Sequence, residues 1–162
     1  MGHLAIFPGS FDPIHYGHIN IAERAAKLFD ELLFCVYANP AKSNVLFSTE
    51  ERVEMAKGAL AHIPNLTVVP YSGLTVNYAR EVGADAMIRG LRIMSDFDYE
   101  LRMALINKIQ APEIETVSLM SDEEHIGFAS SVVKELASMG GDISRFVPPL
   151  VAEALKKKYE KQ

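Results

Sequence analysis

The chain has 162 residues, and its 21 acidic and 16 basic side chains give a formal net charge of −5 at pH 7. This acidic balance argues against a general nucleic-acid binder, which carries an excess of basic residues. Hydrophobic residues make up 49% and charged residues 23%, as in ordinary globular domains. A single cysteine, Cys35, excludes an internal disulfide and a cysteine-based zinc cluster. Because it lies in an apolar run, we expect a packed core thiol.

No segment suggests export or membrane insertion. Residues 1–3 lead straight into a short apolar run, without the charged region and long apolar stretch of a signal peptide. No apolar run approaches the length needed to span a bilayer. We therefore expect a cytoplasmic protein with no membrane partner.

Short apolar runs alternate with amphipathic stretches along the chain. The expected strands are residues 4–7, 32–37, 66–69, 86–88 and 116–119. The expected helices begin near residues 16, 48, 75, 97, 130 and 149. This alternation predicts a single Rossmann-like α/β domain over residues 1–162, with a doubly wound, five-stranded, mostly parallel sheet covered by helices on both faces.

Local signals place several helix boundaries. Ile21, Ala25 and Leu28 have the spacing of one face of the first helix, which is expected to end near residues 29–30. Ser48-Thr49-Glu50-Glu51 is a capping-box pattern at the start of the second helix. Ser130 or Ser131 is expected to cap a later helix.

The loop at residues 8–18 follows the first strand and leads into the first helix. In an open parallel sheet, ligands bind outside the carboxyl ends of the strands, and a helix start there offers free N–H groups to an anion. His15 and His18 project to one side if the helix begins near Tyr16, and Gly17 permits a close approach. The alternative is that His18 caps the helix and His15 is a solvated loop residue.

Other polar residues are expected at the same edge of the sheet. Arg89 and Arg92 follow the fourth strand, where two guanidiniums can grip phosphate oxygens. Ser130 and Ser131 stand at a helix start and offer hydroxyls beside free N–H groups. The plainer alternatives are solvated arginines and an ordinary capping serine. Lys42 follows the second strand in a loop with polar neighbours, and from composition alone a solvated surface lysine is favoured.

Several motifs resemble a known family. His15-Tyr16-Gly17-His18 is similar to the HxGH signature of nucleotidyltransferases, and residues 7–18, 89–92 and 96–100 resemble the phosphopantetheine adenylyltransferase family. Residues 128–134 resemble the superfamily motif written ISSSxxR or ISSTxxK, although Ala129 replaces its first serine and residues 125–127 replace a Trp-Ser-Phe-like run. Ser10 stands where the family commonly has threonine. The resemblance extends from residue 5 to about residue 146.

The resemblance implies a reaction and a set of site residues. Members of this family transfer the adenylyl group of ATP to 4′-phosphopantetheine, giving dephospho-coenzyme A and pyrophosphate. It implies catalytic roles for His18, Lys42 and Arg92, and substrate binding by Ser10, Lys42, Thr75 and Arg89. The ATP-binding residues implied are Ser10, Phe11, His18, Gly90, Leu91, Arg92, Glu100, His125, Ile126, Gly127, Phe128, Ala129, Ser130 and Ser131. Asp12 and His15 are supporting candidates.

The resemblance also implies cofactors and partners. Mg²⁺ is expected on the ATP phosphates with water ligands, and the sequence indicates no protein residues dedicated to a metal ion. A homohexamer and feedback by coenzyme A are expected, and no nucleic acid is expected to bind.

Two other functions stay open at this point. The first is another HxGH adenylyl- or cytidylyltransferase, acting on nicotinamide mononucleotide or glycerol phosphate. The second is a non-catalytic ATP-binding sensor, which would keep the phosphate site without needing His18 and Lys42. A dehydrogenase is disfavoured because the first loop lacks the G-x-G-x-x-G spacing of a dinucleotide site.

Overall fold

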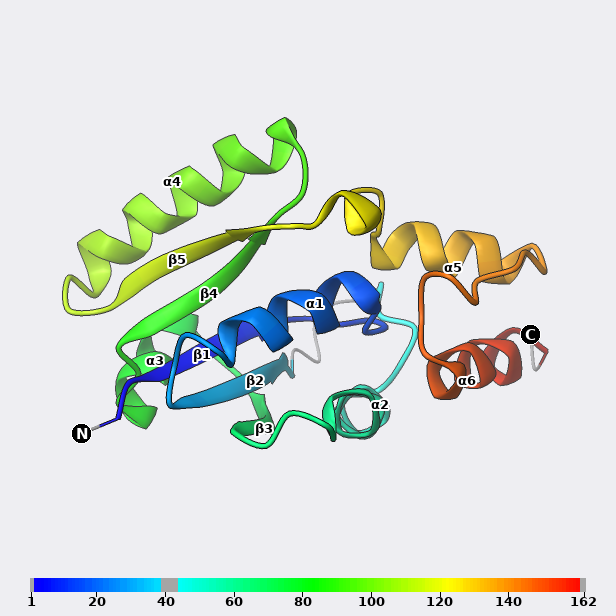
Figure 1. The fold of residues 1–162 in the computed structure, drawn as a ribbon, viewed down its shortest axis with the longest axis horizontal. Coiled ribbons are helices and arrows are strands. Elements are labelled where there is room, and N and C mark those ends of the chain that lie inside the picture. Colours follow the sequence, from blue (N-terminus) through cyan, green and yellow to red (C-terminus); the bar gives the residue numbers. More distant parts are fainter. Residues whose placement is uncertain (1, 39–43, 161–162) are drawn as a thin grey trace.

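The computed structural model describes residues 2–38 and 44–160. Within these residues a parallel sheet has the strand order β3-β2-β1-β4-β5 (Figure 1). The strands are β1 (Leu4–Gly9), β2 (Glu31–Tyr37), β3 (Leu66–Tyr71), β4 (Ala86–Leu91) and β5 (Glu115–Met120). The predicted Rossmann-like α/β sheet is confirmed.

Helices connect the strands and cover both faces of the sheet. They are α1 (Tyr16–Ala25), α2 (Thr49–Leu60), α3 (Thr75–Val82), α4 (Met94–Gln110), α5 (Ser130–Ser138) and α6 (Pro149–Glu160), with a 3₁₀ turn η1 (Glu123–His125) before α5. Side chains of α1, α2, α5 and α6 share one apolar core, and α3 contributes to a second. Helices α5 and α6 lie beyond the carboxyl ends of the strands (Figure 1). In the described residues, no helix has the length and apolar character to cross a membrane.

The alternation of side chains along the strands divides the two cores. Ala5 and Phe7 of β1 belong to the larger core, whereas Ile6 between them belongs to the smaller one. Such alternation is the two-residue period of a strand buried on both faces. Cys35 of β2 is fully buried in the smaller core, and burial raises the pKa of its thiol to about 12. The expectation of a packed core thiol is confirmed.

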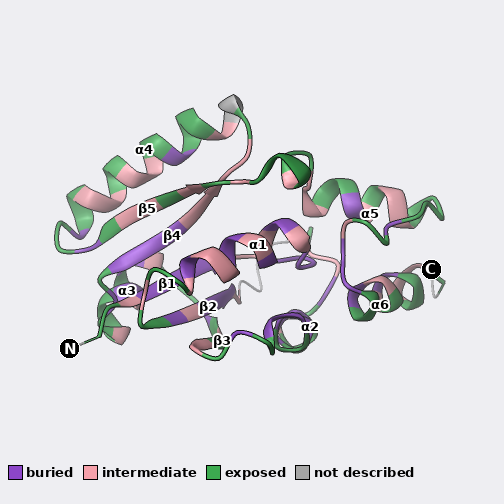
Figure 2. Ribbon diagram, viewed as in Figure 1, coloured by how far each residue is buried: buried purple, intermediate pink, exposed green. Residues whose placement is uncertain are grey.

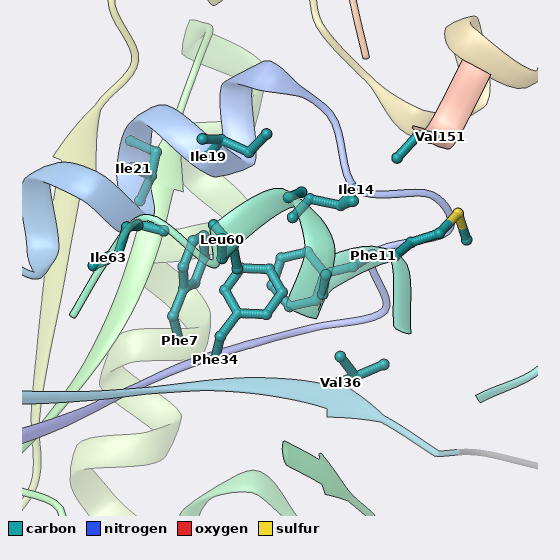
Figure 3. Packing of buried hydrophobic residues seen from close by; sticks show 14 of the residues in the cluster. Phe7, Phe11, Ile14, Ile19, Ile21, Phe34, Val36, Leu60, Ile63 and Val151 are labelled. Carbon is teal, nitrogen blue, oxygen red and sulfur yellow. The ribbon is translucent and has the colours of Figure 1, made fainter. Parts of the chain in front are cut away.

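Three aromatic rings fill the larger core beneath the first loop (Figure 3). Phe11 stacks on Phe34 with ring centroids 3.9 Å apart, and Phe7 meets each of them edge-on at 5.3 Å. Phe11 adopts a positive φ of 47°, which is uncommon for a residue other than glycine. Burial of its ring in this cluster compensates for that backbone conformation and ties the loop to the sheet.

The first helix is shorter than predicted. It ends at Ala25 instead of residues 29–30, so Leu28 is 63% exposed and does not share the buried face of Ile21. The side-chain amide of Asn65 donates to the carbonyls of Ala26 and Phe29, at 2.8 and 3.0 Å. These tertiary hydrogen bonds hold a turn where the apolar spacing alone predicted helix.

The two predicted serine caps have different outcomes. Ser48 caps α2 in the expected capping box, accepting from Glu51 N at 3.1 Å. The prediction that Ser130 or Ser131 caps α5 is wrong, because Ala129 is the N-cap and makes no side-chain cap bond. The hydroxyl of Ser130 instead donates to the carbonyl of Pro13 at 2.8 Å. Ser130 is thus the first residue inside the helix, and its hydroxyl joins α5 to the first loop instead of capping the helix.

Helix α4 forms as predicted, but much of its apolar surface is not covered by the chain itself. Phe97, Leu101 and Leu105 follow helical spacing and are 47%, 45% and 59% exposed. Ile109, one turn further, is 82% exposed. Figure 2 shows the contrast with the buried central strands.

The sheet order creates a crossover point beside β1. The chain leaves β1 toward β2 and β3 on one side and continues with β4 and β5 on the other. The carboxyl ends of β1 and β4 therefore lie side by side while the chain departs from them in opposite directions. Ligands of open α/β sheets bind at such a point.

The aromatic cluster yields a stability prediction. Phe34 is fully buried, so Phe34→Ala is expected to lower the free energy of unfolding by about 3–5 kcal/mol through lost burial and a residual cavity. The control Leu28→Ala, at a site 63% exposed, is expected to change it by less than about 0.5 kcal/mol. Urea denaturation followed by circular dichroism measures both, and equal losses would contradict this description of the core.

Candidate active site

Two adjoining cavities open at the crossover point. The larger has a volume of about 800 Å³ and lies between the first loop, Arg92 and the start of α5. The smaller, of about 380 Å³, lies between β3, α3 and α4. Pro8, Gly9, Ser10, Arg89 and Glu100 line both. Ser10 and Arg89 therefore stand at the junction of the two cavities.

His15 and His18 cap the start of α1, which borders the larger cavity. The Nδ1 atom of His15 accepts from Gly17 N at 3.1 Å and His18 N at 3.4 Å, and the Nδ1 atom of His18 accepts from His15 N at 3.2 Å. The two rings stack with centroids 3.6 Å apart. His15 is 3% exposed, which rules out a solvated loop residue. The prediction that both rings lie on one side of the helix start is confirmed.

Gly17 is required by the His15 ring. A Cβ atom added at Gly17 would lie 2.8 Å from Cε1 and 2.9 Å from Nδ1 of His15, closer than real Cβ contacts. The close approach predicted for this glycine is thus made by the neighbouring imidazole. The spacing His-x-Gly-His follows from this stacked double cap.

The environment keeps both imidazoles neutral. Burial lowers the pKa of His15 to about 3, and the nearby Arg92 and His125 act in the same direction. Burial also lowers the pKa of His18 well below its usual value, with His15, Arg92 and Arg89 adding to the effect. Because the Nδ1 atom of His18 accepts a backbone N–H, the proton of the neutral ring lies on Nε2. His18 is therefore a preorganised neutral hydrogen-bond donor.

Arg89 is fixed at the junction of the cavities. Its Nε and one terminal nitrogen donate to the carboxylate of Glu100 at 2.9 and 2.8 Å, and the other terminal nitrogen donates to the carbonyl of Pro8 at 3.1 Å. Burial acts to lower the pKa of Arg89, but the hydrogen bond and charge of Glu100 outweigh it and raise the pKa. Glu100 of α4 thus holds Arg89 through a bidentate hydrogen bond.

Arg92 is oriented by two different segments. Its Nε donates to Asp96 at 3.2 Å, one helical turn further along the chain. A terminal nitrogen donates to the carbonyl of Phe128 at 2.8 Å, which joins β4 to the segment before α5. The guanidinium lines the larger cavity with its remaining donors available to an anion.

The start of α5 faces the same cavity. Ala129, Ser130 and Ser131 line it, and the N-cap residue Ala129 makes no side-chain hydrogen bond to the first N–H groups of this helix. Free N–H groups at a helix start attract anions. Lys134, one turn into α5, donates to Asp12 at 2.9 Å and so joins the helix to the first loop.

The smaller cavity has a different character. Tyr37, Tyr71, Leu74, Tyr99 and Met103 contribute apolar and aromatic surface to its wall. The hydroxyl groups of Tyr71 and Thr75 lie 3.1 Å apart within hydrogen-bonding distance. Such walls suit an extended, weakly polar ligand rather than a second polyphosphate.

Most predicted site residues meet at these cavities. Of the predicted ATP-binding residues, the larger cavity is lined by Ser10, Phe11, His18, Gly90, Arg92, Glu100, Ala129, Ser130 and Ser131. The smaller is lined by Ser10, Thr75 and Arg89, all predicted to bind the second substrate. Leu91, His125, Ile126, Gly127 and Phe128 are not among the described residues that line either cavity. Lys42 lies outside the described residues. The roles assigned to all of these residues stay predictions.

Two charged residues of the site received no role from the sequence. Asp96 orients Arg92, and Lys134 pairs with Asp12. The i, i+4 spacing of Arg92 and Asp96 is a local signal that could have identified the first pair. The second pair is separated by 122 residues, so no local signal predicts it.

The buried histidines predict a pH dependence of stability. His15 has a pKa of about 3 in the folded protein and about 6.5 when unfolded, so the folded state binds fewer protons between these values. The free energy of unfolding should therefore fall as the pH drops below 6.5, by at most about 1.4 kcal/mol per pH unit for this residue.

The variant His15→Asn isolates that contribution, since asparagine keeps a capping oxygen but does not titrate. Urea unfolding between about pH 6 and pH 4 is expected to show a shallower loss of stability in the variant than in the unaltered protein. Parallel pH profiles would mean that His15 is not held neutral.

Comparisons with known proteins identify the family of the chain. The cytidylyltransferase-like family model matches residues 6–136. A phosphopantetheine adenylyltransferase from Caldanaerobacter subterraneus subsp. tengcongensis is 51% identical over 158 residues, which cover 98% of each chain.

Two solved structures share the fold at low sequence identity. A Vibrio parahaemolyticus protein described as a candidate nicotinate-nucleotide adenylyltransferase matches with a TM-score of 0.73 and 18% identity, covering 100% of this chain and 98% of its own. A bifunctional NMN adenylyltransferase/ADP ribose pyrophosphatase from Francisella tularensis matches with a TM-score of 0.73 and 17% identity over 100% of this chain and 51% of its own. The chain belongs to the cytidylyltransferase-like family and, within it, to the phosphopantetheine adenylyltransferases.

Proposed function

We propose that the protein transfers the adenylyl group of ATP to 4′-phosphopantetheine, giving dephospho-coenzyme A and pyrophosphate. The observation that carries the proposal is the junction of the two cavities at Ser10 and Arg89. One cavity offers cationic and N–H donors suited to a triphosphate, and the other offers apolar walls suited to a pantetheine arm. A relative that is 51% identical and is named phosphopantetheine adenylyltransferase supports the same function.

The ATP phosphates would bind between α5 and Arg92. The first N–H groups of α5 and the guanidinium of Arg92 supply donors for the β- and γ-phosphates. Because the hydroxyl proton of Ser130 is used by Pro13, Ser130 would contribute its backbone N–H, whereas Ser131 can also offer its hydroxyl. These donors would stabilise the negative charge that develops on the pyrophosphate as its bond to the α-phosphorus breaks.

The acceptor phosphate would bind at Ser10 and Arg89. Glu100 and Pro8 hold the guanidinium in place before any ligand arrives, so little ordering is needed on binding. The pantetheine arm would then extend past Thr75 and Tyr71. An oxygen of the acceptor phosphate attacks the α-phosphorus of ATP, and the bond to the pyrophosphate oxygen breaks.

The transfer requires no activated protein nucleophile, because a phosphate oxyanion is already nucleophilic. Catalysis then consists of positioning and stabilising charge. The Nε2–H group of neutral His18 would donate to the α-phosphate as its charge develops. By family resemblance, Lys42 would orient the acceptor phosphate and stabilise the transition state.

Magnesium is proposed as part of the nucleotide substrate. In the part of the chain that the structure describes, no group of three or more His, Cys, Asp or Glu side chains is placed to hold a metal ion. Mg²⁺ would be coordinated by ATP phosphates and water, its usual habit. Omitting Mg²⁺ from the assay without losing turnover would contradict this proposal.

The direct experiment is to incubate the protein with ATP, Mg²⁺ and 4′-phosphopantetheine and to weigh the product by mass spectrometry. Dephospho-coenzyme A together with pyrophosphate is the expected result. Product formed only with nicotinate or nicotinamide mononucleotide, or with glycerol phosphate, would assign a different transferase. Tight ATP binding without exchange of labelled pyrophosphate for any acceptor would instead assign a nucleotide sensor.

The role of His18 gives a kinetic prediction. His18→Ala is expected to lower kcat by about 10²-fold or more, the scale of losing one transition-state donor, while the KM for ATP changes far less. The matched control is His62→Ala, because the side chain of His62 is 54% exposed and pairs with Glu23 away from the cavities. Near-normal turnover of the His18 variant would remove this residue from the mechanism.

A homohexamer is proposed for the assembly. The exposed apolar side chains of α4, including Leu105 and Ile109, are candidates for burial against further copies. Analytical ultracentrifugation at micromolar concentration should show a single hexameric species. A monomer would contradict the proposal.

We also propose a cytoplasmic location and inhibition by coenzyme A. Coenzyme A contains the same pantetheine arm and adenylyl group as the product, so it should compete for both cavities. Inhibition that is insensitive to 4′-phosphopantetheine concentration would argue against competition at the smaller cavity.

Recovery of the protein in a membrane fraction would contradict the proposed cytoplasmic location.

A further inference from the structure

Arg52 is a buried arginine that touches neither cavity directly. It lies in the first turns of α2, is 2% exposed and is absent from the linings of both cavities. A buried guanidinium requires several acceptors to offset its desolvation. The segments that provide those acceptors meet at the first loop, residues 8–18.

Each side of the guanidinium has a partner. One terminal nitrogen donates to the carbonyls of Ser10 and Tyr37, at 2.7 and 2.9 Å. The Nε atom donates to the carbonyl of Phe47 at 3.2 Å, and the other terminal nitrogen donates to Thr49 Oγ1 at 3.2 Å. Arg52 therefore joins the loop after β1, the end of β2 and the residue before the cap of α2.

The same loop is held from its other side by Asp12. This carboxylate is 6% exposed and accepts from Leu46 N at 2.8 Å, Phe47 N at 3.0 Å and Lys134 Nζ at 2.9 Å. Burial lowers the pKa of Arg52 below its usual value, and the charges of Asp12 and Glu50 oppose this shift without cancelling it. Two buried opposite charges thus anchor the chain on both sides of Phe11.

We propose that Arg52 is a positioning residue for the transfer reaction. Its guanidinium holds the backbone of Ser10, and therefore the loop between the two cavities, at the point where the two substrates meet. This inference rests on the proposed function. Arg52 acts through Ser10, whereas the donors proposed for the β- and γ-phosphates of ATP belong to α5 and to Arg92, and the hydrogen bonds of the Arg52 guanidinium go to other residues.

That separation predicts a selective kinetic effect. Arg52→Lys keeps the charge but loses the planar fork that reaches several carbonyls at once. A small displacement of reacting groups costs up to about 10²-fold in rate, so kcat is expected to fall by about 10- to 100-fold. The KM for ATP is expected to change by less than about threefold, because the phosphate donors on α5 and Arg92 stay in place.

A purely structural role must be distinguished from positioning. Arg52→Gln is the second variant, because it removes the buried charge and leaves an amide that can reach one carbonyl. Leu60→Ala is the matched control, since Leu60 is 2% exposed on the same helix and lies outside both cavity linings. It should destabilise α2 while leaving kcat within about twofold of the unaltered protein, measured well below its unfolding temperature.

The folded fraction of each variant is measured by circular dichroism in the assay buffer, and rates are expressed per folded molecule. A selective loss of kcat in both Arg52 variants supports the proposal. Rates equal to those of the Leu60→Ala control, a matching rise in the KM for ATP, or failure of both Arg52 variants to fold would overturn it in favour of a structural role. Absence of dephospho-coenzyme A with the unaltered protein would instead refute the proposed function.

Discussion

The parallel pairing of β1 with both β2 and β4 is the constraint on which the site depends. Because β1 has a partner on each side, its carboxyl end opens at the centre of the sheet beside that of β4. The last residues of β1 and the arginines at the end of β4, Arg89 within the strand and Arg92 after it, consequently lie next to each other, although about 80 residues separate Pro8 from Arg89. The direct hydrogen bond between these two residues joins the strand ends.

The site combines charged side chains that are fixed by ion pairs with backbone N–H groups that are left for a ligand. Arg89, Arg92, Asp12 and Lys134 each have a partner in the protein that fixes the side chain. The start of α5, in contrast, has Ala129 as its N-cap, whose side chain makes no bond to the first N–H groups. Donors held rigid in a partly desolvated cavity stabilise a developing charge with little reorganisation. The stacked histidines are also held in place before a ligand binds, and their neutral state avoids the cost of burying two like charges.

Several features of the fold and of the site follow from local sequence patterns. The alternation of apolar runs predicted the parallel sheet, and the Ser48–Glu51 pattern predicted the cap of α2. The spacing of His15 and His18 predicted two rings on one side of a helix start, because that relation depends on helical periodicity alone. Local patterns were insufficient where distant contacts act: Asn65 holds a turn after the end of α1, and Ser130 bonds Pro13 from inside α5 while Ala129 takes the N-cap position.

The sequence by itself determined the order of elements, the helix-start histidines and the family to which their motifs belong, since each is encoded within a few neighbouring residues. The tertiary structure decided which side chains hold the site in place. Arg52 meets Ser10, and Lys134 meets Asp12, across 42 and 122 residues. No periodicity or local propensity encodes such contacts, because they exist only after the sheet has brought distant loops to one edge.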